Sequence, residues 1–150
     1  MTVSQKLQVA RNLIAEGWIS CALVSLGVDG RLRYCARGAL NKAFLGRATS
    51  DAETSPDDEL RLAQRLVAEA MQGPLQVGSD SKAIRDAITK WNDSQFGYDA
   101  QVRVVDAFDA AIAECKQLEA ASKSHQESCS GYVERMQREG LPLPRAQNLV

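Results

Sequence analysis

The sequence predicts a mainly α-helical fold: a compact bundle of about five helices, one short β-hairpin near residues 23–34, and a C-terminal helical extension. Apolar residues recur at spacings of three and four through most of the chain, which is typical of helices with one buried face. A single Asp-Gly pair interrupts that spacing. With 150 residues, 45% of them apolar, the chain is long enough to bury a core. We therefore expect a helical domain over residues 1–120 and an extension, a short helix plus a Pro-containing tail, over 121–150.

The first helix is expected over residues 4–16. Ser4 is the predicted N-cap and Gly17 the predicted stop. The pattern then changes to β-branched and alternating residues around Asp29-Gly30, a strong signal for a tight hairpin turn. We expect residues 23–26 to pair with 31–34. Because an isolated two-stranded ribbon is only marginally stable, it should lie against helices.

Helical spacing resumes from Cys35 to Leu45, and Gly46 supplies the stop. Gly38 inside this helix costs about 1 kcal/mol relative to Ala. The usual reason for such a cost is the close approach of another backbone, so a tight helix crossing is expected there. The next helix should start at Ser55-Pro56, where Ser is an N-cap and Pro a favoured first residue, and should end at Gly73-Pro74.

The next predicted helix starts at Ser79 or Asp80 and ends at a corner formed by Trp91, Asn92 and Asp93. Trp91 completes an apolar stripe and should be buried. Asn92 and Asp93 have no periodic role, so they either bond the backbone of the turn or face a partner. If both side chains instead pointed into an open cleft near Cys35, the corner would be a site.

The longest apolar stripe follows Asp99, the predicted cap, and runs from Val104 to Leu118. The stripe thins after Leu118 and resumes near residue 129. Because helices of about 40 residues are rare in globular proteins, a break at Ser128–Gly131 is favoured over one continuous helix. Pro142 and Pro144 indicate an extended final segment.

Composition excludes several classes of protein. No stretch of 18 apolar residues is present, which argues against a membrane span. The first residues lack the pattern of a secretory signal, so a cytoplasmic location is expected, in the host cytoplasm if the gene is carried by a phage. Four scattered cysteines and one histidine lack the close spacing of structural metal sites. Phosphate-binding glycine motifs are also missing, so neither a metal nor a cofactor is predicted.

A basic surface is one candidate interaction site. The first 50 residues are rich in Lys and Arg, and Arg31, Arg33 and Arg37 lie close to Tyr34 in the sequence. Arginines beside an aromatic ring can bind nucleic acid. The alternative is an ordinary solvated hairpin face, and the sequence pI of about 5.9 favours that alternative.

The C-terminal third offers the other candidate. Four apolar positions at helical spacing, Cys129, Tyr132, Val133 and Met136, resume the stripe beyond the predicted domain. Such a stripe can pack back on the core, pair with a second copy, or bind another protein. A protein partner or a second copy is therefore expected, with nucleic acid as the less favoured partner and no membrane.

Three motifs carry a family resemblance: Trp18 after the first helix, the run Cys35-Ala-Arg-Gly-Ala-Leu40, and Trp91-Asn92-Asp93. Together they resemble a small domain family of unknown function found in actinobacteria and their phages, over roughly residues 6–120. The recurring marks of that family map onto Cys35, Gly38, Ala39, Leu40, Trp91, Asn92 and Asp93. The resemblance implies a phage or actinobacterial origin and no mechanism.

We therefore expect a non-enzymatic protein-interaction module, such as a phage accessory protein acting on a host partner. A nucleic-acid-associated regulator using Arg31, Arg33 and Arg37 is the alternative. A third hypothesis, an enzyme organised around Cys35 with Asn92 and Asp93, requires a reactive Cys35 thiolate.

Overall fold

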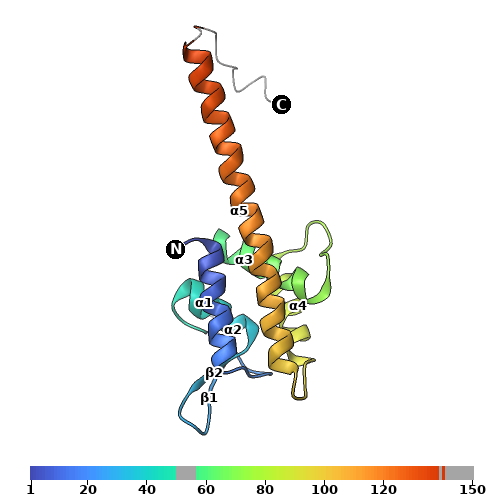
Figure 1. Ribbon diagram of the computed structural model, residues 1–150. Coiled ribbons are helices and arrows are strands. Elements are labelled where there is room, and N and C mark those ends of the chain that lie inside the picture. Colours follow the sequence, from blue (N-terminus) through green and yellow to red (C-terminus); the bar gives the residue numbers. More distant parts are fainter. Residues whose placement is uncertain (50–56, 139, 141–150) are drawn as a thin grey trace. The chain divides into compact units, whose positions relative to one another are not determined.

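Five helices and a two-stranded hairpin follow one another along the part of the chain that the computed structural model describes, residues 1–49, 57–138 and 140 (Figure 1). This arrangement confirms the predicted fold class. In chain order the elements are α1 (Val3–Glu16), β1 (Val24–Leu26), β2 (Leu32–Tyr34), α2 (Ala36–Leu45), α3 (Asp58–Gln72), α4 (Ser81–Asp93) and α5 (Ala100–Arg138).

The chain divides into two units, Met1–Cys115 and Lys116–Val150. The first unit contains α1 to α4, the hairpin and the beginning of α5. Helix α5 continues without interruption into the second unit. The boundary lies near the residue 120 expected from the sequence, although the predicted division into two domains remains a prediction.

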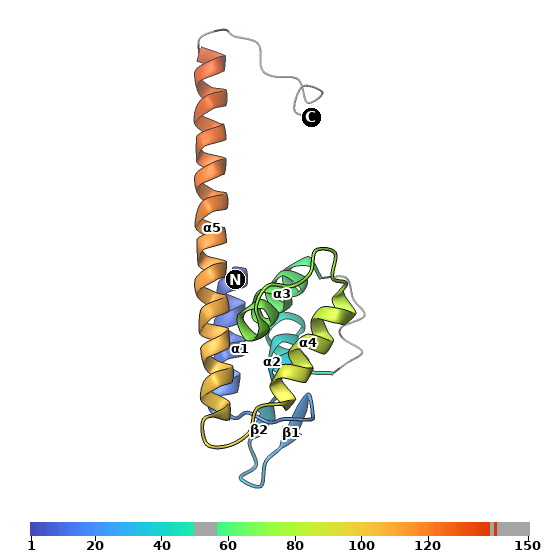
Figure 2. The same cartoon turned by 90° about the vertical axis from the view of Figure 1, so that its right-hand side faces the viewer.

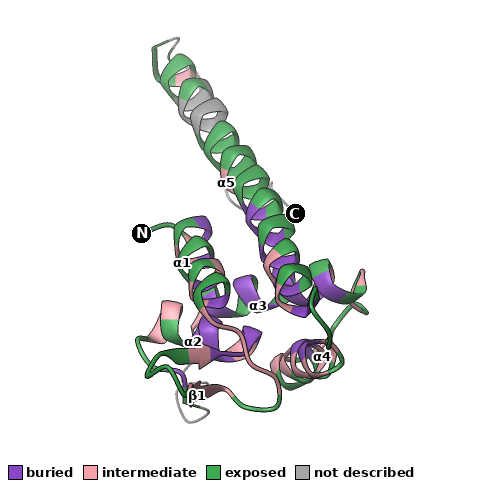
Figure 3. Ribbon diagram, turned by 60° about the horizontal axis from the view of Figure 1, so that its bottom comes forward, coloured by how far each residue is buried: buried purple, intermediate pink, exposed green. Residues whose placement is uncertain are grey.

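The core of the first unit forms where its helices face one another. Helix α1 packs on α2, α3 packs on α4, and α2 contacts both α3 and α4. Figure 3 shows buried positions on the facing sides of these helices. Six of the largest fully buried side chains are Leu7, Ile14, Leu40, Val67, Ile88 and Phe108.

The first turns of α5 lie beside α1, as both views show (Figures 1 and 2). An ion pair joins Arg11 to Asp109, with 3.0 Å between Nε and Oδ1. At the other end of the contact, the Gln101 side chain donates to the Ile14 carbonyl across 2.7 Å. The Ile14 carbonyl belongs to the last turn of α1, so this bond supplies a donor to an oxygen that the helix itself leaves unpaired.

Two helices begin at residues other than the expected caps. Thr2, not Ser4, caps α1: its Oγ1 accepts from the Gln5 N–H (3.3 Å), and the Gln5 side chain accepts from the Thr2 N–H (2.8 Å). This reciprocal pair satisfies two N–H groups, whereas a cap at Ser4 would satisfy one. Asp57 caps α3 through the Leu60 N–H (2.8 Å). The predicted start at Ser55-Pro56 lies outside the described residues.

The hairpin is confirmed, with Val24 opposite Tyr34 and Leu26 opposite Leu32. The close approach expected at Gly38 is also present, but the prediction of a helix crossing was wrong. A Cβ atom at Gly38 would lie 1.9 Å from the Leu23 carbonyl oxygen, so the neighbouring backbone is the segment that leads into β1. Gly38 therefore fixes how closely α2 and the hairpin approach.

The predicted break at Ser128–Gly131 was wrong, because α5 is one helix of 39 residues. The backbone φ angle of Gly131 is negative, so this residue does not adopt the left-handed conformation that often ends a helix. A single Gly costs a helix only about 1 kcal/mol relative to Ala, and the residues that follow it include the strong helix formers Glu134, Arg135 and Met136. The Pro-containing tail, residues 141–150, lies outside the described residues.

Candidate functional site

The corner at the end of α4 is organised around the buried side chain of Asn92. Its Oδ1 accepts two hydrogen bonds, from the Trp18 indole N–H (2.9 Å) and from the Ala36 backbone N–H (3.0 Å). Its Nδ2 donates to the Ile19 carbonyl (3.4 Å) and to Asp93 Oδ1 (3.1 Å). One amide therefore joins α4 to the segment after α1 and to the first turn of α2.

Asp93 holds a strained residue. Its Oδ1 accepts the Cys21 backbone N–H across 2.8 Å. Cys21 has φ of +63°, the only positive φ among the described residues other than glycines. That left-handed conformation is unfavourable for a residue with a Cβ atom. The carboxylate therefore fixes a backbone conformation that the chain would not adopt by default.

Of the two alternatives for Asn92 and Asp93, bonds to the backbone of the turn itself are not what the structure shows. Both side chains reach segments far away in the sequence. The turn is held instead by Ser94 and Gln95, whose side chains donate to the Trp91 carbonyl at 2.7 and 3.1 Å. Trp91 packs against the core but is half-buried.

Cys35 starts helix α2. It occupies the N-cap position usually taken by Ser, Thr, Asp or Asn, and its Sγ accepts the Gly38 N–H across 3.3 Å. Burial raises the pKa of the Cys35 thiol above its ordinary value, an effect that outweighs the bonds from the backbone N–H groups of Gly38 and Arg37. At neutral pH the thiol therefore stays protonated, and its observed role is to cap the helix.

Cys35 and Asp93 line the same small hollow, about 150 Å³ in volume. Asn92 is not among the residues that line it, and its side-chain oxygen bonds Trp18 and Ala36 instead. A site at the corner would require the side chains of both Asn92 and Asp93 to face a cleft near Cys35. Only Asp93 does so. The other polar residues of this hollow, hereafter the cysteine hollow, are Cys21, Arg37 and Thr89.

The structure separates the residues of the predicted basic surface. Arg31 is exposed and borders a different groove. Arg33 lies 3.7 Å from Asp29, and Arg37 lines the cysteine hollow, where its Nη1 donates to Thr89 Oγ1 (3.4 Å). Tyr34, the aromatic residue named with these arginines as an interaction candidate, is 6% exposed and belongs to the core. Burial in strand β2 increases along the chain, from the exposed Leu32 through the half-buried Arg33 to the buried Tyr34.

The C-terminal candidates all belong to α5. The backbone of residues 129–136 is helical, and Met136 is half-buried. The side chains of Cys129, Tyr132 and Val133 lie outside the described part of the structure. Their position on one helical face follows from their spacing.

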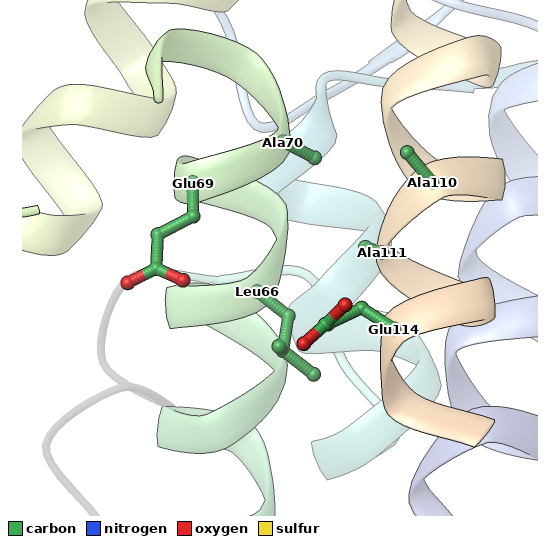
Figure 4. Close-up of a pocket in the computed structure, with 6 residues that line it drawn as sticks. All are labelled: Leu66, Glu69, Ala70, Ala110, Ala111 and Glu114. Atoms are coloured by element: carbon green, nitrogen blue, oxygen red, sulfur yellow. The ribbon is translucent and has the colours of Figure 1, made fainter. Parts of the chain in front are cut away.

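A second hollow, about 260 Å³, lies between α3 and α5. Three alanines and Leu66 form much of its wall, and Glu69 and Glu114 stand at its edges (Figure 4). Figure 4 shows Glu114 extending toward Leu66, whereas the Glu69 carboxylate points away from α5. Glu69 pairs with Arg65 on its own helix at 3.2 Å. The two carboxylates therefore do not converge on a common point.

Sequence reasoning missed three features of the surface and the corner. Trp18 and Cys21 meet the corner from more than 70 residues away, a relationship that no local pattern encodes. The loop after α4 exposes both of its aromatic residues, Phe96 at 82% and Tyr98 at 105%. Gly97 lies between these two aromatic residues, which indicates a loop, and loop residues are usually exposed.

The described residues offer neither a metal site nor a membrane-spanning helix. Within residues 1–49, 57–138 and 140, no group of three or more His, Cys, Asp or Glu side chains is placed to hold a metal ion. In the described part of the chain, no helix has the length and apolar character needed to cross a membrane.

The fold and the corner define a small helical domain in which a buried amide joins three segments. The model of a family of unknown function, DUF6197, matches residues 1–114, and the chain therefore belongs to that family. The match ends one residue before the first structural unit ends, at Cys115. No curated protein and no solved structure matches the chain.

Proposed function

We propose that this protein is a non-enzymatic protein-interaction module whose binding element is the C-terminal half of α5. The support is a repeat along that helix. Positions at alternating spacings of four and three residues are buried in the first unit, namely Val104, Phe108, Ala111 and Cys115. The same alternation continues beyond the unit through Leu118, Ser122, His125, Cys129, Tyr132 and Met136. We call these six positions the α5 seam.

An alternation of four and three residues is the repeat by which two helices pack along their length. Leu118, the first seam position, is 45% exposed. A second copy of the chain offers an identical seam, which makes symmetric pairing the simplest partnership. Polar seam residues such as Ser122 lower the strength of the pairing and restrict which helices fit.

Light scattering on the full chain tests this proposal. We expect a concentration-dependent dimer, which the double substitution Tyr132→Asp and Met136→Asp converts to monomer because it places charges in the seam. Ser124→Asp with Gln137→Asp is the matched control: it adds the same charge at exposed positions of the same helix and should leave the dimer intact. A partner captured by the wild-type and control chains but not by the seam variant supports a heterologous helix instead.

A chain that remains monomeric at high concentration, and that captures no protein in a seam-dependent way, would contradict the proposal. The family resemblance adds a biological setting. We propose a phage or actinobacterial origin, with the module acting on a host protein in the cytoplasm. Expression in an actinobacterial host, followed by comparison of proteins retained by the control and seam variants, tests that setting directly.

Nucleic-acid binding is the second candidate and has narrower support, the exposed Arg31 beside the partly paired Arg33. The buried ring of Tyr34 is not available for stacking on a base. Binding of duplex DNA at low salt should weaken steeply with added salt and with Arg31→Ala, because the contacts would be to phosphates. Absence of binding at low salt would end this candidate.

A further inference from the structure

Two cysteines, Cys21 and Cys35, line the cysteine hollow. Cys21 is exposed and Cys35 is buried, and both are free thiols in the structure. Asp93 and Arg37 also face this space. The two cysteines of this hollow therefore differ in access to solvent, since Cys21 is open to reagents and Cys35 is shielded.

The backbone holds the two cysteines near each other. The Ile19 N–H donates to the Tyr34 carbonyl (3.2 Å), and the Cys35 N–H donates to the Leu23 carbonyl (3.2 Å). Cys21 lies midway in the chain between Ile19 and Leu23, the two residues of this segment that make these hydrogen bonds. Cys21 is two residues from each of these bonded positions, and two residues of chain span at most about 7 Å. Cys21 therefore cannot move far from Cys35 unless one of the two hydrogen bonds breaks. A disulfide needs Cα atoms about 4.4–6.8 Å apart, so closure requires that the segment from Ile19 to Leu23 bring Cys21 within that distance of Cys35.

The conformation of Cys21 is a second, independent observation. Its φ of +63° would be adopted more easily by Gly or Asn. Asp93 fixes this conformation through the Cys21 N–H. Strained residues of this kind occur where a side chain is used. Here the strain sets the direction of the Cys21 side chain at the hollow that contains Cys35.

We propose that Cys21 and Cys35 form a thiol–disulfide exchange site that closes to an intramolecular disulfide when it meets a low-molecular-weight disulfide such as oxidised glutathione. The closed form would link the segment before β1 to the N-cap residue of α2. This inference concerns the first unit alone, and it does not depend on the pairing proposed for α5.

The reaction has two steps. The Cys21 thiolate attacks one sulfur of the small disulfide, whose S–S bond breaks; one thiol leaves after taking up a proton, and Cys21 becomes a mixed disulfide. Cys35 then loses its proton and attacks the Cys21 sulfur, which forms the new S–S bond and releases the second small thiol. Overall the two protein thiols lose two electrons and two protons, and the small disulfide gains both.

The structure assigns the order of the two cysteines. Cys21 is accessible, so it meets the reagent first. Cys35 is 6% exposed and its thiol is kept protonated by burial, so it reacts only with a sulfur delivered beside it. Arg37, which lines the same hollow, places a positive charge near the thiolate that forms on Cys35 in the second step.

Peptide mapping tests the site. The folded full chain, in which Cys115→Ser and Cys129→Ser remove the other thiols, is incubated with oxidised glutathione, alkylated and digested with trypsin. The expected product joins the peptide 12–31 to the peptide 34–37, with the mass of two lost hydrogens and no bound glutathione. Reduction should separate the two peptides.

Replacing each of the two cysteines by Ser provides the controls for the disulfide. Cys35→Ser folds, because Ser is itself a preferred N-cap, and it should accumulate glutathione on Cys21. Cys21→Ser should leave Cys35 unmodified under the same conditions. A stable glutathione adduct on Cys21 in the chain that retains Cys35 would overturn the proposal, as would a chain left unmodified or a disulfide that links two molecules.

Discussion

The Trp18 indole N–H donates a hydrogen bond of 2.9 Å to Asn92 Oδ1, joining residues 74 positions apart in the sequence. The same oxygen accepts the Ala36 N–H at the start of α2. Because a helix leaves its first N–H groups without partners, Asn92 acts as a cap supplied by a different helix. Three segments of the first unit are therefore held in register by one amide.

Replacing Asn92 by Ala should destabilise the protein by about 2–4 kcal/mol, because it leaves the N–H groups of Trp18 and Ala36 without their acceptor. Urea unfolding followed by circular dichroism measures the change in the free energy of unfolding. Asn12→Ala is the matched control: Asn12 is exposed on α1, so its replacement should stay within about 0.5 kcal/mol of wild type. Equal effects of the two substitutions would contradict the role given to Asn92.

Gly38→Ala should prevent close packing of α2 against the segment before β1, because the new Cβ would meet the Leu23 carbonyl oxygen at 1.9 Å. Backbone has to move, and a loss of about 2–3 kcal/mol is expected from such overpacking. Gly131→Ala is the contrasting control. A Cβ atom at Gly131 would have nothing within 4 Å, so this substitution should favour the helix by about 1 kcal/mol. The thermal unfolding midpoint of the first unit should fall for Gly38→Ala and stay unchanged for Gly131→Ala, because residue 131 belongs to the second unit.

Local chemistry was enough to predict much of the fold. Asp29-Gly30 located the hairpin, Gly73 ended α3, and Asp80 began α4, because turn and cap preferences act between residues close in sequence. The capping of α1 by Thr2 shows the limit of this reasoning. Thr2 and Ser4 are both good caps, and the choice depends on the reciprocal bond from Gln5.

The corner could be located from the sequence, but its bonding could not. Asn92 stood out because it had no place in the apolar stripe, yet its partners Trp18 and Ala36 come from other elements. A similar limit applies to Tyr34. Alternation places Leu32 and Tyr34 on one face of β2, yet only Tyr34 is buried, because burial depends on where α1 and α2 contact the strand.

Because the Cys35 thiol is buried, we expect the free energy of unfolding to fall at alkaline pH. Its pKa in the folded protein is raised by burial, so the unfolded chain loses this proton first as the pH rises. The stabilising contribution is therefore complete below the ordinary thiol pKa of about 8.5 and is lost as the pH rises through the folded value. Urea unfolding at pH 7, 9 and 10 should show a decline that Cys35→Ser reduces. An identical decline in the variant would show that other groups cause it.

Because α5 is one continuous helix through residue 131, a proline at that position should break it. Gly131→Pro removes an N–H from the helical hydrogen-bond ladder and introduces a ring that clashes with the preceding turn, at a cost of about 3 kcal/mol. Because residue 131 belongs to the second unit, the helix should fray there while the first unit keeps its stability. Circular dichroism should show a loss of helix signal with an unchanged unfolding midpoint, whereas Gly131→Ala should retain the full signal. If α5 acts through its seam, only the Pro variant will lose self-association, since it interrupts the repeat between Cys129 and Tyr132.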